Sequence, residues 1–234
     1  MSLPSLAVLD SFKRGNEDPL SNGGKWQKQE GHTSLSISTA GKIVSEKYVG
    51  ETANENSAFW SPEEFTEKAV AVYLYGVETG LEGPLWLYNC LQSPEIEGNK
   101  SGYILLLQGM GAGALKWTLY ADDFTGKVEG SAVTNSTKDG DGAALWVNAG
   151  LVSAWYKPGA GAWEELFATS SASYTKGYAA IRSTKSENGA LTNFSVSGTG
   201  KYIQSLSGTL PFSGKLVPHK ESSGNTNTLS MIIS

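Results

Sequence analysis

The sequence predicts an all-β fold of the jelly-roll sandwich class, and two features carry that prediction. Apolar residues recur with a period of two, as in strands, rather than with the period of about 3.6 residues found in helices. The apolar runs are also short, and Gly, Pro, Asn or Asp separates each run from the next, as in sandwiches and barrels. A chain of 234 residues, 39% of them hydrophobic, falls within the range of roughly 200–250 residues that single β-sandwiches occupy.

The expected strands follow one another along most of the chain. Alternation is clearest at residues 33–38, where Leu35 and Ile37 share one face. The other expected strands cover residues 68–75, 84–90, 102–108, 114–121, 143–148, 151–156, 163–168, 177–182 and 191–197. Ala149 and Gly150 lie between two of these runs and predict a tight hairpin.

One short helical turn is expected, over residues 61–65. Ser61 is a good N-cap, Pro62 suits the first helical position, and the acids that follow suit a first turn. No other window shows a sustained helical period. The chain is therefore expected to hold strands with at most one turn of helix between them.

The amino-acid composition changes near Gly198. We expect the sandwich to cover residues 1–197 and a C-terminal extension, rich in Ser, Gly and Thr, to cover residues 198–234. Apolar strand-like segments tend to pair with another strand, so the extension either adds a last strand to its own domain or docks on a neighbouring subunit. In the second case its apolar residues are assembly contacts, namely Leu210, Phe212, Leu216, Met231, Ile232 and Ile233.

Charge and terminal sequence exclude several classes of partner. The net charge is −5, and no basic run is present to bind nucleic acid. No polybasic or amphipathic stretch favours a membrane surface. Residues 1–5 lack the charged and apolar regions of a signal peptide. The single cysteine, Cys90, is expected to be a small buried residue on a strand.

Two stretches of the chain resemble a known module. Asp10 and Phe12 stand at the end of the first expected strand, a turn leads to Trp26, and the last expected strand carries Phe194 and Val196. This layout resembles the concanavalin A-like, laminin-G-like jelly-roll modules of bacteriophage virion proteins. Phe12, Trp26, Phe194 and Val196 are expected to face the core where the first and last strands pair.

The resemblance, which covers residues 5–197, implies a function in assembly. It implies a structural protein of the virion, such as a tail, fibre or head-decoration component, that is made in the host cytoplasm. Its expected partners are copies of itself and other virion proteins, with a host-surface glycan as a further ligand. A carbohydrate-binding module without a structural role is the alternative.

The carboxylates do not follow a catalytic pattern. Glycoside hydrolases of this fold resemble one another in a Glu-x-Asp-x-Glu strand, which places a nucleophile and an acid on one face. The acid pairs of this chain stand beside turns instead: Glu63 with Glu64, Glu95 with Glu97, Asp122 with Asp123, Asp139 with Asp141, and Glu164 with Glu165. We therefore expect a protein that is not an enzyme, with a glycan-cleaving enzyme as the least favoured alternative.

Calcium is the one cofactor that the sequence accommodates. Asp139 and Asp141, in the run Lys-Asp-Gly-Asp-Gly, offer two hard oxygen donors on a turn. The same residues are also simply a good turn sequence, so both interpretations stay open.

Aromatic residues give the strongest indication of a ligand. The chain has seven Trp and ten Tyr, and sugar-binding sandwich proteins stack such rings on pyranose faces. Most of these rings are expected to fill the core. The candidate ligand contacts are Trp86 and Tyr88, which share one face of a strand, together with Trp117 and Trp155.

Overall fold

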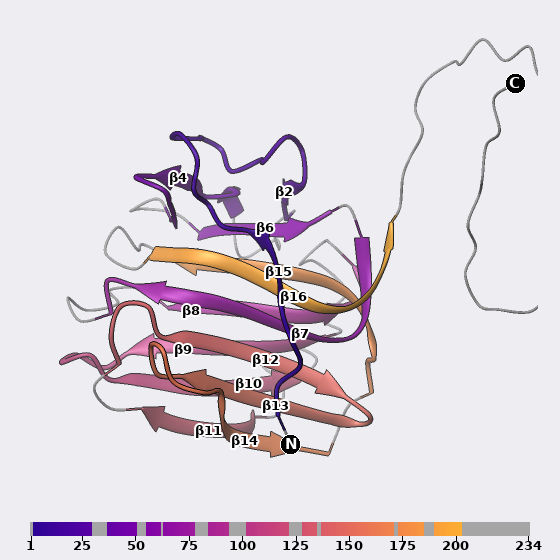
Figure 1. Cartoon of the computed structure of the whole chain (residues 1–234). Helices are drawn as coiled ribbons and strands as arrows, with labels where there is room; N and C mark the ends of the chain where they lie inside the picture. The colour runs from indigo at the N-terminus through magenta and orange to yellow at the C-terminus, as the bar shows by residue number, and fades with distance from the viewer. Residues whose placement is uncertain are drawn as a thin grey trace, which may run out of the picture. The chain divides into compact units, whose positions relative to one another are not determined.

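The computed structural model describes residues 2–29, 37–50, 55–61, 63–77, 84–93, 102–121, 128–134, 137–170, 173–184 and 190–202. Every helix or strand within these residues is a β-strand (Figure 1), which confirms the all-β prediction. The described residues contain no helix long and apolar enough to cross a membrane.

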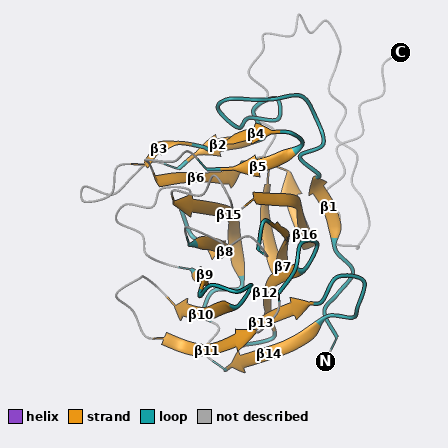
Figure 2. Ribbon diagram, turned by 90° about the vertical axis from the view of Figure 1, so that its left-hand side faces the viewer, coloured by secondary structure: helices purple, strands orange, loops and turns teal. Residues whose placement is uncertain are grey.

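The strands form two antiparallel sheets that lie face to face (Figure 2). Sheet A runs in the order β14 (Glu164–Thr169), β13 (Leu151–Lys157), β12 (Gly142–Asn148), β7 (Glu63–Tyr75) and β16 (Ala190–Tyr202). Beyond β16 it ends in β1 (Ala7–Asp10), β5 (Lys47–Val49) and β4 (Lys42–Val44).

Sheet B runs in the order β11 (Val128–Thr134), β10 (Leu115–Ala121), β9 (Tyr103–Gly109), β8 (Leu85–Leu91), β15 (Lys176–Thr184) and β6 (Glu55–Trp60). Two short strands then flank β6: β2 (Trp26–Lys28) and β3 (Ile37–Thr39), of which only β3 is parallel to it. The sheets join where Lys176 and Gly177 of β15 pair with β7.

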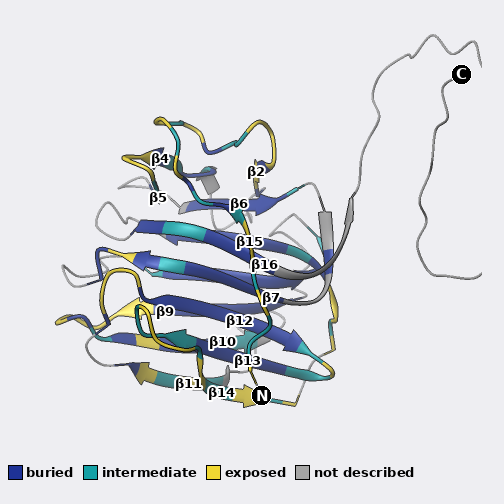
Figure 3. Cartoon of the chain, viewed as in Figure 1, coloured by how far each residue is buried: buried dark blue, intermediate teal, exposed yellow. Residues whose placement is uncertain are grey.

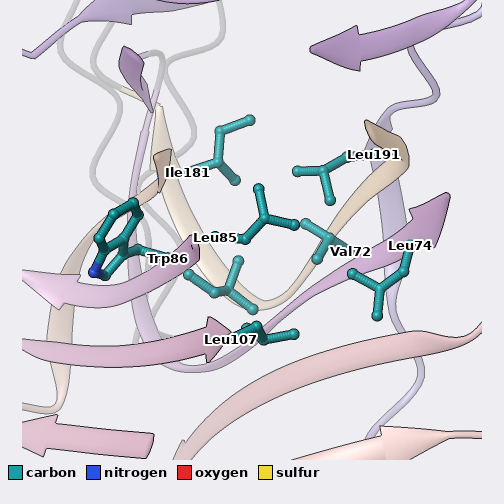
Figure 4. A pocket seen from close by; sticks show the side chains of 8 residues that line it. Val72, Leu74, Leu85, Trp86, Leu107, Ile181 and Leu191 are labelled. Carbon is teal, nitrogen blue, oxygen red and sulfur yellow. The ribbon is translucent and has the colours of Figure 1, made fainter. Parts of the chain in front are cut away.

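Strand alternation divides each sheet into an inner and an outer face. On β7, Val70, Val72 and Leu74 point into the core between the sheets, whereas Ala69 and Ala71 lie on the outer face. Figure 3 shows the central strands as buried almost throughout. The hollow in Figure 4 lies among core side chains such as Leu74 and Leu191. Its lining offers no polar anchor besides one indole, so it belongs to the core.

The first and last strands pair as expected, since Ala7 lies opposite Val196 and Asp10 opposite Phe194. Phe12 and Trp26 stack with ring centroids 6.2 Å apart, and Trp26 meets Phe194 edge-on at 4.8 Å. These rings and Val196 are buried in the main core. The predicted core contacts of the first and last strands are confirmed.

A buried carboxylate closes this end of the sandwich. Asp10 Oδ1 accepts hydrogen bonds from the Phe12 amide and from Arg14 Nη1, both at 2.7 Å. Asp10 Oδ2 accepts from Trp26 Nε1 at 2.8 Å and from Asn22 Nδ2 at 3.2 Å. Burial opposes the charge of Arg14, but its hydrogen bonds to Asp10 and Glu17 outweigh burial and raise its pKa. The Asp-x-Phe motif therefore holds the end of β1 to the turn and to β2.

The predicted helical turn over residues 61–65 is wrong. β7 begins at Glu63, and its first residues pair with the end of β16, where Tyr202 lies opposite Glu63 and Gly200 opposite Phe65. Ladder pairing over this length overrides a local capping signal. In contrast, the hairpin at Ala149 and Gly150 is confirmed, with φ of 46° and 86°.

The last described strand, β16, continues past Ser197 to Tyr202. The assembly residues predicted in the extension, from Leu210 to Ile233, lie outside the described residues, as does most of the strand expected over residues 33–38.

Replacing Asp10 tests the carboxylate network. We expect Asp10→Asn to lower the free energy of unfolding by about 2–3 kcal/mol, because hydrogen bonds to a charged partner are the strong ones. Chemical denaturation measures this, with Asp18→Asn as the control because Asp18 is exposed. Equal losses in the two variants would contradict the role of Asp10.

The phenol of Tyr48 makes stability depend on pH. Burial raises its pKa from 10.0 to about 12, although the hydrogen bond with Ser183 lowers it in part. The unfolded chain therefore loses this proton first, and the free energy of unfolding falls between the two pKa values. We expect Tyr48→Phe to remove up to about 1.4 kcal/mol per pH unit of that fall. Denaturation curves from pH 9 upward test this, and identical slopes in the two proteins would contradict it.

Candidate functional site

The predicted ligand contacts Trp86 and Tyr88 lie side by side on the outer face of sheet B. The guanidinium of Arg182, on the neighbouring strand β15, lies 4.5 Å from the Trp86 ring centroid, and its Nη1 is 3.5 Å from the Tyr88 hydroxyl. The same outer cluster includes Phe59, whose ring meets Tyr178 edge-on. Trp86 is 9% exposed and Tyr88 2% exposed, so little of either ring is available to a ligand.

Trp117 lies in the core, which corrects its prediction as a ligand contact. Its side chain is 0% exposed. The indole Nε1 donates to Thr134 Oγ1 at 2.7 Å, and the ring meets Tyr156 edge-on at 5.9 Å. Because the inner face of β10 packs against sheet A, a surface ligand cannot reach this ring.

The carboxylates of Asp139 and Asp141 accept hydrogen bonds from different sets of donors. Asp139 Oδ1 accepts from the amides of Gly76 and Val77. Asp141 Oδ1 accepts from the Gly159 amide, and its Oδ2 accepts from the Lys138 amide and the Tyr156 hydroxyl. Burial first, and then this hydrogen bond to Asp141, raises the pKa of Tyr156.

These contacts leave the two carboxylates with structural roles. In the part of the chain that the structure describes, no three His, Cys, Asp or Glu side chains gather as metal ligands. The geometry therefore favours the turn interpretation of the Lys-Asp-Gly-Asp-Gly run. Calcium binding stays a prediction that these contacts do not support.

The outer face of sheet A carries the fourth predicted residue, Trp155. Its indole Nε1 donates to Ser153 Oγ at 2.7 Å. Its ring lies 5.7 Å from that of Trp146 on the neighbouring strand β12. Trp155 is 2% exposed and Trp146 is 9% exposed, so Trp146 is the ring of this pair that has more of its surface open to solvent.

A pocket opens beside Trp146 at the β14 edge of sheet A. Strand register explains it, because Trp146 lies opposite Ser153 on β13, and Ser153 lies opposite Ala168 on β14. One large ring is thus followed by two small side chains, which leave space in front of the indole. The pocket is lined by Trp146, Asn148, Leu151, Ser153, Glu165 and Ala168.

The pocket combines one aromatic wall with several polar groups. Asn148 offers an amide, Ser153 a hydroxyl and Glu165 a carboxylate that lies on an exposed edge strand. Donors and acceptors of this kind, set around a ring, are what a polyhydroxylated ligand requires. The lining contains a single carboxylate, which is the only ionised side chain among the residues that form it.

The sequence predicts Trp155 as a ligand contact but does not single out the residues beside it that line the pocket. Alternation already places Trp146 and Asn148 on one face of β12. The sequence indicates only that Glu165 stands beside a turn, because nothing in it sets the register between β13 and β14. A bulge between Ala154 and Trp155 shifts that register, and a shift of this kind carries no clear sequence signal.

No protein-family model matches the chain, and no curated protein matches it. Solved structures do match. A legume lectin-like domain from Entamoeba histolytica has a TM-score of 0.51 at 8% identity, over 80% of this chain and 96% of that one. The VIP36 exoplasmic/lumenal domain in its Ca2+/Man2-bound form has a TM-score of 0.51 at 9% identity, over 80% and 84%. A Bacillus licheniformis β-glucanase has a TM-score of 0.50 at 8% identity, over 79% and 97%.

At these identities the likeness concerns the fold alone. Together with the two packed sheets, it confirms the concanavalin A-like jelly-roll sandwich that the sequence predicts. These neighbours give no support to a bacteriophage virion context. The chain is a jelly-roll domain with the lectin-like arrangement of two antiparallel sheets.

Proposed function

We propose that this chain is a lectin-like carbohydrate-binding domain, and that the pocket beside Trp146 holds one sugar ring. The observation that carries the proposal is the set of side chains around that pocket. An indole wall, an amide, a hydroxyl and a carboxylate converge on one hollow at an open sheet edge. The glycan-bound form of VIP36, a neighbour in fold, agrees with this class of ligand.

The chemistry of the pocket suits binding rather than cleavage. A pyranose ring presents an apolar face that stacks on an aromatic ring, and its hydroxyls donate to carboxylates and accept from amides. Glycoside hydrolysis generally requires two carboxyl groups across the scissile bond. The described lining has only Glu165. The fold likeness to a β-glucanase therefore does not extend to an acid pair in this pocket.

The outer face of sheet B is a second candidate for the same function. Trp86, Tyr88 and Arg182 bring two rings and a cationic group together there. Trp86 and Trp146 are equally covered, each 9% exposed, so it is the set of polar side chains around the pocket beside Trp146 that favours sheet A. Substitutions on the two faces distinguish the two candidates.

Glu165 provides the sharpest test of the proposed pocket. A glycan array identifies a ligand, and titration of that glycan measures its affinity. We expect Glu165→Ala to weaken binding about tenfold or more, because a hydrogen bond to a charged group contributes about 1.5–3 kcal/mol. Asn148→Ala is expected to weaken binding in the same direction. Both residues lie toward the surface, so folding should be retained.

Glu164→Ala is the matched control, since Glu164 lies on the same strand and is exposed but does not line the pocket. Trp86→Ala tests binding on the outer face of sheet B. If Glu165→Ala binds the glycan with unchanged affinity and Trp86→Ala binds it more weakly, the site lies on sheet B. An array without any bound glycan would contradict the function itself.

The virion context is the second part of the proposal, and the sequence resemblance alone supports it. The apolar residues of the extension, such as Phe212 and Ile232, are proposed to dock on neighbouring copies. Light scattering tests this on the full chain and on a chain that ends at Gln204, beyond β16. We expect a defined oligomer for the full chain and a folded monomer for the shorter one. Two stable monomers would contradict assembly through the extension.

A further inference from the structure

The N-terminal residues 2–6 cross the outer face of sheet A. In Figure 1 this indigo segment runs from β1 across the strands of sheet A to the N label, and Figure 2 shows it on the side away from sheet B. Leu3 and Leu6 pack against the outer cluster that contains Trp146 and Trp155. We call residues 2–6 the strap.

A trough of alanines receives the strap. Ala69 and Ala71 lie two apart on β7, and Ala144 on β12 lies opposite Ala71. All three are fully buried, although they point away from the core between the sheets. Small side chains at neighbouring positions of adjacent strands leave a depression in a sheet surface. Leu3 and Leu6 of the strap, together with Trp163, pack against the cluster to which these alanines belong.

Only apolar contact holds the strap in place. Among the hydrogen bonds and ion pairs of the described residues, none involves residues 2–6. The residues that follow it differ in this respect, since β1 pairs with β16 from Ala7 onward. Segments with few apolar contacts and no backbone pairing open far more easily than the body of a domain. The strap can therefore leave the trough while β1 stays paired.

The trough and the sugar pocket share a wall. Trp146 belongs to the cluster under the strap and also lines the pocket. Trp155, which touches Trp146, lies opposite Ala144 on one side and Glu165 on the other. Without the strap, the alanines and the two indoles of the cluster would be covered only by Trp163 among the residues packed against it, and exposed rings beside the pocket could stack on further sugar rings.

We propose that the strap is a displaceable cover over glycan subsites that extend the pocket across sheet A, so that a long oligosaccharide must lift it to bind. This inference rests on the proposed glycan function. A single sugar ring needs only the pocket and is indifferent to the strap. A longer chain competes with Leu3 and Leu6 for the trough, and its apparent affinity equals the intrinsic affinity multiplied by the fraction of molecules whose strap is open.

The experiment compares three proteins: the full chain, a chain that lacks residues 2–6, and Leu3→Ser/Leu6→Ser in the full chain. Each is titrated with mannose and glucose and with their linear oligomers of two to six units. We expect both altered proteins to bind the longer oligomers at least about tenfold more tightly than the full chain, because minor open states are typically populated at about 10% or less. Monosaccharide affinity should stay within about twofold. Val8→Ser is the control, since Val8 is 57% exposed just outside the strap.

A readout without ligand separates displacement of the strap from binding. Acrylamide quenching of tryptophan fluorescence should increase in the chain that lacks residues 2–6, because Trp146 and Trp155 lose their cover, and thermal unfolding should stay cooperative. A gain in affinity for long oligomers together with increased quenching supports the proposal. If the three proteins bind every oligomer with equal affinity and monosaccharide binding is intact, the role of the strap is refuted. The proposal of the sugar pocket would still stand. Absence of binding in all of the proteins would refute the pocket and the strap together.

Discussion

The buried carboxylate of Asp10 is the interaction on which one end of the sandwich depends. Four donors converge on it: the Phe12 amide, Arg14, Asn22 and the Trp26 indole. A charge withdrawn from water to this degree is stable only when its oxygens are satisfied. The network thus requires the end of β1, the following turn and β2 to keep their relative positions. It also fixes the point from which the strap departs, because residues 2–6 directly precede β1.

The two faces of sheet A then acquire different roles through side-chain size. Inward residues of β7 and β12, such as Val72 and Leu145, fill the core in the usual way. On the outer face, small residues such as Ala71 and Ala144 lie among large rings such as Tyr73 on β7 and Trp146 on β12. This contrast in size creates both the trough and the pocket. The site therefore results from which outward positions lack bulk as much as from which positions carry a ring.

Much of the fold could be predicted because its signals are local. Period-two alternation gave the strands, Ala149 and Gly150 gave the hairpin, and the Asp-x-Phe motif with Trp26 gave the pairing of first and last strands. The helical turn at Ser61 failed because a long-range ladder with β16 outweighs a local cap. Alternation places Trp117 on the apolar face of β10 with Leu115 and Leu119, opposite Lys116 and Thr118, so the sequence pattern favours the core position that the structure shows.

The site could be predicted only in part, because long-range strand pairing rather than a local signal brings its residues together. Trp155 was identified as a ring that could leave the core, yet the pocket depends on the register of Trp146, Ser153 and Ala168 across three strands. That register is set by the hairpin on one side and by a bulge on the other. Arg182 was missed beside Trp86 because its strand, β15, is distant in sequence from β8. Cross-strand neighbours of this kind become visible only in three dimensions.

The central claim is that sugar binds on the outer face of sheet A, and the indole resonances of the seven tryptophans test it most directly. A nitrogen-edited NMR titration with the glycan that the domain retains reports on each indole N–H separately. If sugar binds on the outer face of sheet A, the Trp146 resonance shifts most and the Trp155 resonance next, while the resonances of Trp86 and the buried Trp117 do not shift. Shifts confined to Trp86 would place the ligand on sheet B and contradict the account.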